Sequence, residues 1–168
     1  MNNKIQRLNQ AFDAIEAGDM KKLVTLVRNR SEANWTRVGQ GWSLLDAAVL
    51  FKRYDAASWL LNRGANPNTL FSFDEPILPS EATADGMYFS PLASAISEGD
   101  ATLVKLLIDA GADLSLPKIV EGDERLTCWD ALLEDRSLMA KIERHLLSKA
   151  PEQSSISLPL GSRSSRAL

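Results

Sequence analysis

Apolar side chains recur at helical spacing in the middle of the chain, in two short runs that a polar turn separates. The first run is Leu92, Ala95 and Ile96, and the second is Leu103, Val104, Leu107 and Ile108. Gly99 lies between the runs. Gly111 follows the second run, where a helix end favours the left-handed conformation that glycine adopts at least cost. The pattern predicts a helix, a tight turn, a second helix and a glycine stop.

The same pattern occurs earlier in the chain. Residues 43–68 align with residues 90–115 at an offset of 47 residues and without a gap. Identical residues stand at several aligned positions, among them Ser43 and Ser90, Leu45 and Leu92, Gly64 and Gly111, and Ala65 and Ala112. A pair of helices this short cannot bury its apolar face alone, so we expect units that stack on one another.

The later copy resembles the ankyrin repeat. Ser90-Pro91-Leu92 stands where that repeat opens with T-P-L, Gly99-Asp100 takes the turn between its helices, and Gly111-Ala112-Asp113 takes its G-A-D ending. The earlier copy departs from this motif, because Asp46 replaces the histidine and Lys52-Arg53 replaces the glycine turn. These changes leave its hydrophobic pattern intact.

Two weaker copies flank this pair. Gly18-Asp19 repeats the glycine turn 34 residues before Lys52, and Trp129 stands 37 residues after Leu92 at the matching position. Both outer copies lack the G-A-D ending and carry more charge, as capping units do. The resemblance implies an all-α fold, an ankyrin-repeat solenoid of stacked helix-turn-helix units with finger loops between them.

This resemblance gives a domain organisation. We predict a single ankyrin-repeat domain over residues 1–150, with units at about 4–33, 41–68, 88–117 and 125–150. Residues 151–168 contain six serines and few apolar residues, so we predict a disordered tail.

A long insertion is expected between the second and third units. The offset of 47 residues exceeds the ankyrin period of about 33, and we place the extra residues at 69–87. This segment has no Lys or Arg, and it carries Phe71, Phe73, Asp74, Glu75 and Asp85. Two interpretations remain open: its aromatic side chains fold back to cover the stack, or they form a contact patch beside the carboxylates.

Charge is distributed unevenly along the chain, although the formal net charge is only −3. Residues 69–135 carry three Lys or Arg and fourteen Asp or Glu, whereas the segments on either side each have a balance of +4. The acidic middle is either a solvated face or a surface that attracts a basic partner. No basic stripe runs along the chain, so we expect no nucleic-acid ligand.

The residues that we predict to contact a partner lie in the fingers between the units. Tryptophans in the first finger are either binding hot spots or buried side chains that close the cap. Acidic residues of the third finger lie on the side of the long loop in the ankyrin arrangement. The predicted contact residues are Trp35, Trp42, Phe71, Phe73, Asp74, Glu75, Asp85, Glu121, Asp123 and Glu124.

Catalytic and metal-binding constellations are not evident. His145 is the only histidine and Cys128 the only cysteine, so the spacing of a zinc site is missing. Cys128 matches Pro91 at the start of a helix, which favours a structural role. The alternative is a different class of protein, a thiol-dependent enzyme or redox sensor in which Cys128 reacts. We expect no cofactor and no small-molecule substrate.

The sequence therefore predicts a non-catalytic protein–protein interaction module that binds and inhibits or regulates a partner through its acidic fingers. A partner with a basic contact surface is expected. An alternative is a bacterial immunity-type protein that neutralises a cognate toxin, and another is a spacer without a specific ligand. The start of the chain lacks the apolar run of a signal peptide, and no segment suits a membrane span. With one cysteine, these features favour a cytoplasmic protein.

Overall fold

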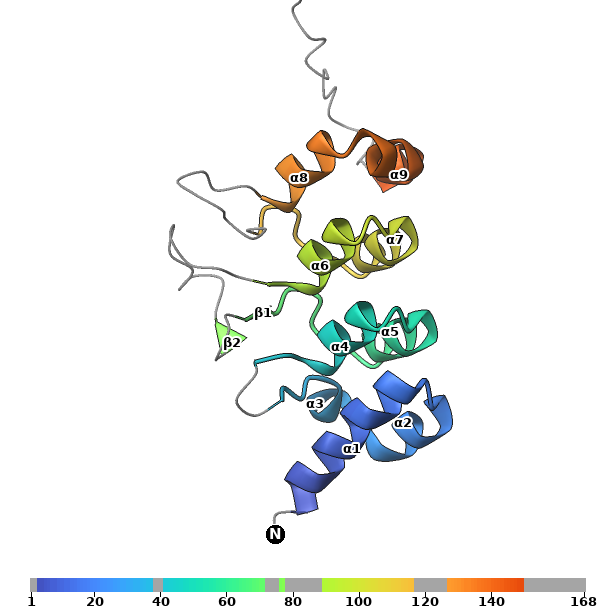
Figure 1. Ribbon diagram of the computed structural model, residues 1–168, viewed down its shortest axis with the longest axis vertical. Coiled ribbons are helices and arrows are strands. Elements are labelled where there is room, and N and C mark those ends of the chain that lie inside the picture. Colours follow the sequence, from blue (N-terminus) through green and yellow to red (C-terminus); the bar gives the residue numbers. More distant parts are fainter. Residues whose placement is uncertain (1–2, 38–40, 72–75, 78–88, 117–126, 150–168) are drawn as a thin grey trace, which may run out of the picture.

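The computed structural model describes residues 3–37, 41–71, 76–77, 89–116 and 127–149. These residues form four helix pairs stacked along one direction, with hairpin fingers on one side (Figure 1). The pairs are α1 (Asn3–Ala17) with α2 (Met20–Leu26), α4 (Leu44–Leu50) with α5 (Tyr54–Asn62), α6 (Pro91–Ser97) with α7 (Ala101–Asp109), and α8 (Cys128–Glu134) with α9 (Arg136–Lys149). A short helix, α3 (Arg30–Ala33), follows α2, and strand β1 (Leu70–Phe71) pairs antiparallel with β2 (Pro76–Ile77).

Hydroxyl caps begin the first helix of three units. The side chains of Ser43, Ser90 and Thr127 accept hydrogen bonds from the third residue of α4, α6 and α8, at 3.1 to 3.2 Å. In α4 and α8 that third residue is Asp46 or Asp130, whose carboxylate binds the backbone of the cap residue in return. Such caps each contribute about 1 kcal/mol. They matter here because helices of seven residues are marginal alone.

The turn inside each of the first three units requires a left-handed residue. Gly18 and Gly99 have φ of 74° and 62°, and Lys52 holds the same position in the second unit with φ of 53°. Gly64 and Gly111, at φ of 87° and 86°, end the second helices of their units. The glycine stops are therefore where the pattern predicts them, and Lys52 adopts the glycine conformation despite its side chain.

The core runs continuously through the stack. Helix α4 packs between α1 and α6, α8 packs on the other side of α6, and α9 packs on α7. Leu44, Leu45, Leu92 and Leu107 are fully buried in a cluster that continues from α1 to α9. Full burial of such a side chain contributes about 1.5–3 kcal/mol. Each unit thus depends on its neighbours, as expected for stacked repeats.

The first and second fingers are closed by matching backbone hydrogen bonds but differ in length. In the first finger, Arg37 N donates to Trp42 O at 2.7 Å. In the second finger, Phe71 N donates to Phe89 O at 3.0 Å, and Phe89 N donates to Phe71 O at 2.9 Å. Four residues separate the first pair and seventeen separate the second. Leu70 and Phe71, which the sequence places in the insertion, are buried at the base of the second finger.

Several segments discussed in the sequence analysis lie outside the described residues. They are the predicted tail at 151–168, most of the long loop and most of the third finger. Within the described residues, each helix is too short or too polar to span a lipid bilayer.

Candidate functional site

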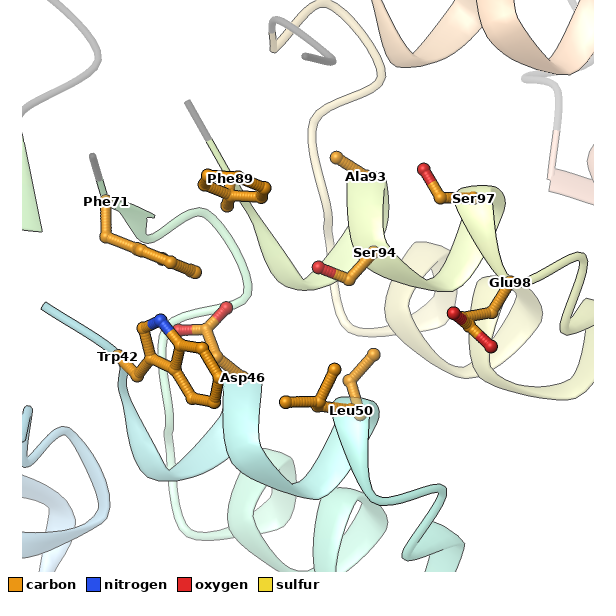
Figure 2. A pocket seen from close by; sticks show the side chains of 10 residues that line it. Trp42, Asp46, Leu50, Phe71, Phe89, Ala93, Ser94, Ser97 and Glu98 are labelled. Atoms are coloured by element: carbon orange, nitrogen blue, oxygen red, sulfur yellow. The ribbon is translucent and has the colours of Figure 1, made fainter. Parts of the chain in front are cut away.

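A pocket lies between the second and third units, where α4 and α6 meet the base of the second finger. Its volume is about 360 Å³, and its walls are mostly apolar. Figure 2 shows side chains from both helices and from the finger facing one another across it. The lining residues are Trp42, Asp46, Val49, Leu50, Phe71, Phe89, Ala93, Ser94, Ser97 and Glu98.

Three aromatic rings form one wall of this pocket. The ring centroids of Trp42 and Phe71 are 5.9 Å apart, with an interplanar angle of 52°. Phe71 and Phe89 stack with centroids 5.2 Å apart and planes inclined by 20°. Both separations are typical of favourable aromatic pairs. Because the backbones of Phe71 and Phe89 also exchange two hydrogen bonds, the wall is fixed to the stack where the long loop begins and ends.

A buried carboxylate bounds the pocket next to the Trp42 ring (Figure 2). Asp46 is 4% exposed, and its Oδ2 accepts a hydrogen bond from Ser43 N at 2.9 Å and another from the Ser43 hydroxyl. Its Oδ1 is buried and accepts no hydrogen bond from the described residues. Burial raises the pKa of Asp46 to about 6, although the hydrogen bonds from Ser43 act in the opposite direction. At neutral pH the pocket therefore lies beside a buried negative charge.

The opposite rim is exposed and polar. Ser94, Ser97 and Glu98 line it from α6. Lys52 Nζ lies 3.1 Å from Glu98 Oε2, and both side chains are about half exposed. This ion pair joins the turns of the second and third units, although exposed pairs of this kind contribute little to stability.

Two of the predicted contact residues, Trp42 and Phe71, meet in this pocket. Trp35 lies elsewhere: it is 8% exposed, and the Arg7 guanidinium carbon is 5.3 Å from its ring centroid. This burial supports the alternative of a tryptophan that closes the first unit. The remaining predicted contact residues lie outside the described ones, and they are Phe73, Asp74, Glu75, Asp85, Glu121, Asp123 and Glu124.

The predicted contact residues do not include Asp46 or Phe89, which both line the pocket. In the sequence, Asp46 stands out only as a departure from the motif histidine. A signal for Phe89 was present, because Phe89 precedes Ser90 as Trp42 precedes Ser43, at the offset of 47 residues that aligns the units. Two aromatic residues at one repeat position indicate a shared environment.

Side chains with catalytic potential are held in structural contacts. Cys128 is fully buried at the start of α8, and its backbone N donates to Leu116 O at 2.9 Å. His145 Nε2 lies 2.8 Å from Asp109 Oδ1, and Lys149 Nζ lies 2.9 Å from the same oxygen. These contacts, led by the Lys149 hydrogen bond, lower the pKa of Asp109. Across the described residues, no group of three His, Cys, Asp or Glu side chains is arranged to hold a metal ion.

Stacked helix pairs joined through hairpin fingers define a solenoid repeat protein. The family model of the ankyrin repeat matches residues 40–69, so this part of the chain is an ankyrin repeat. The matched span covers α4 and α5 and includes Trp42 and Asp46 of the pocket. No curated protein matches the chain. Ankyrin repeats are generally non-catalytic modules for protein–protein interaction, so the predicted family and the all-α fold are confirmed and the class of function is indicated.

Proposed function

We propose that this chain is a non-catalytic interaction module that binds a partner protein on the side of the stack where α4, α6 and the fingers lie. The observation that carries the proposal is the pocket in which Trp42, Phe71 and Phe89 contact one another. Hot spots of protein interfaces are enriched in aromatic residues that cluster in pockets. A concave apolar site with a few polar groups is also the usual form of a binding site.

Charge favours a partner with a basic contact surface. Residues 69–135, which contain α6 and border the pocket, have a balance of −11. An acidic surface of this kind accelerates encounter with a basic partner and sets orientation more than it adds affinity. The predicted acidic contacts at Asp74, Glu75 and Asp85 belong to this proposal.

Inhibition is the mode of regulation that we favour, because a small stack without catalytic groups in its described residues acts by occupying the surface of its partner. A cytoplasmic location is part of the same proposal. If the chain is instead an immunity-type protein, the partner that it inhibits is a toxin. Co-expression with the captured partner separates these cases, since only a toxin arrests growth unless this chain is present.

Affinity capture with single-residue variants tests the interaction itself. Trp42→Ala removes the central pocket side chain, whereas Trp129→Ala removes a tryptophan of α8 that is 38% exposed and does not line the pocket. We expect wild type and Trp129→Ala to retain the same partner and Trp42→Ala to lose it, with unchanged helical circular dichroism. Equal retention by all three proteins contradicts the proposed site.

A further inference from the structure

We propose that the pocket between α4 and α6 accepts one basic side chain, an arginine or a lysine, from the partner protein. This inference rests on the proposed function and adds the chemistry of the residue that is recognised. It follows from the charge, the aromatic lining and the unused hydrogen-bond acceptor of the pocket.

The ionisable side chains that line the pocket, among the described residues, are two acids. Asp46 lies on the α4 side and Glu98 on the α6 side. Lys52 pairs with Glu98 at the exposed rim, whereas Asp46 makes hydrogen bonds with Ser43 and Thr69 and no ion pair with a described residue. The inner end of the pocket therefore carries a negative charge that a cation complements.

Asp46 also has a free acceptor. Its Oδ2 is used by Ser43, but its buried Oδ1 accepts no hydrogen bond from the described residues. Leaving a buried charged acceptor without a donor is costly. Since Oδ1 is already out of contact with solvent, a purely apolar ligand leaves that cost unchanged, whereas a guanidinium or ammonium group supplies the opposite charge and, after a small rotation of the carboxylate, a donor.

The aromatic wall suits the same ligand. Cations bind favourably over the faces of aromatic rings, and Trp42 offers the strongest face of the three rings here. Arginine and lysine also carry apolar stems that pack on surfaces such as Leu50, which is 43% exposed at the pocket. The volume of about 360 Å³ lies within the usual range of ligand pockets.

Short peptides probe this chemistry with the full chain. Three acetylated and amidated pentapeptides of glycine would carry arginine, citrulline or norleucine at the centre, and the indole N–H signal of Trp42 would report binding by NMR. We expect a saturable shift for the arginine peptide, with an affinity about tenfold higher than for citrulline or norleucine. The indole signal of Trp129, outside the pocket, is the internal reference.

A pair of matched variants tests the role of the carboxylate. Asp46→Asn and Asp130→Asn change the same position of two equivalent capping boxes, and only Asp46 lines the pocket. We expect Asp46→Asn to lose the preference for arginine over citrulline and Asp130→Asn to retain it. The comparison of the three peptides on wild-type protein stands even if Asp46→Asn fails to fold.

Three outcomes overturn the inference: norleucine binds as tightly as arginine, no peptide gives a saturable shift, or Asp46→Asn retains the preference for arginine. None of them affects the capture experiment with Trp42→Ala. Loss of the partner in that variant without any preference for basic peptides would leave the proposed function standing and remove this inference alone.

Discussion

Asn34 and Asn68 make the same pair of hydrogen bonds, each to the turn that ends the following unit. In both cases the amide nitrogen donates to a glycine carbonyl, and the amide oxygen accepts from the backbone N–H two residues later. The bonds are Asn34 Nδ2 to Gly64 O at 2.9 Å, Asn66 N to Asn34 Oδ1 at 2.7 Å, Asn68 Nδ2 to Gly111 O at 3.1 Å, and Asp113 N to Asn68 Oδ1 at 2.8 Å. One side chain thus fixes the spacing of two neighbouring units through a donor and an acceptor.

Removing either amide should weaken the stack. We expect Asn34→Ala and Asn68→Ala each to lower the free energy of unfolding by about 1–2 kcal/mol, with the larger effect at Asn34, whose bond to Gly64 is partly buried. Urea denaturation followed by circular dichroism measures this change. Aspartate keeps the size and the acceptor but loses the donor, so Asn34→Asp should also destabilise. Wild-type stability in that variant would show that the donor contributes nothing.

Lys52 occupies a left-handed conformation that costs a side chain about 1–2 kcal/mol. We expect Lys52→Gly to be more stable than Lys52→Ala by about 1 kcal/mol, the reverse of the order inside a helix. Both substitutions remove the exposed ion pair with Glu98, so the comparison isolates the backbone. Thermal or urea unfolding of the two variants decides the order. If the alanine variant is as stable as the glycine variant, the left-handed turn at Lys52 carries no strain.

Cys128 provides a test of the thiol-dependent alternative. Because it is fully buried, we expect Ellman's reagent to modify it only as fast as the protein unfolds, and immediately in concentrated denaturant. The rate in native protein should therefore follow urea concentration along with the unfolding rate. Rapid modification of the folded chain, independent of urea, would restore the hypothesis of a reactive thiol.

The helix pairs could be predicted from sequence because their determinants are local. Apolar stripes, the hydroxyl caps at Ser43 and Ser90 and the stops at Gly64 and Gly111 all lie within one unit. Repetition at one offset then indicated stacking. Lys52 shows the limit of the motif, since the backbone keeps the left-handed conformation although the glycine is lost.

The pocket was less predictable because it depends on contacts between distant residues. Trp35 and Trp42 look equivalent in the first finger, but Arg7 from α1 covers Trp35, and Trp42 packs against Phe71 of the next finger. Phe89 reaches this cluster only because its backbone pairs with Phe71 across seventeen residues. Only the repeat offset, which aligns Phe89 with Trp42, points to this cluster in the sequence.

Asp46 should make stability depend on pH in an unusual direction. Its pKa is raised from 3.8 to about 6 by burial, so between these values the folded chain binds a proton more tightly than the unfolded chain. The contribution of this group to the free energy of unfolding therefore falls as pH rises from 3.8 to 6 and stays low above 6. The full loss is about 3 kcal/mol, from the difference between the two pKa values. Urea denaturation of wild type and Asp46→Asn from pH 4 to 8 measures it, and we expect the variant to gain stability over wild type as pH rises.

Asp130 provides the control because it makes the same helix cap as Asp46 but has a lowered pKa instead of a raised one. The hydrogen bond from the Thr127 hydroxyl, with that from the Thr127 backbone, lowers the pKa of Asp130. Its contribution to stability is thus present above the pKa of the unfolded chain and is lost as pH falls through the folded value. Because this change lies below about pH 4, Asp130→Asn should keep a nearly constant stability difference from wild type between pH 4 and 8, whereas Asp46→Asn should gain stability over wild type in that range. Parallel curves for the two variants would mean that burial does not raise the pKa of Asp46.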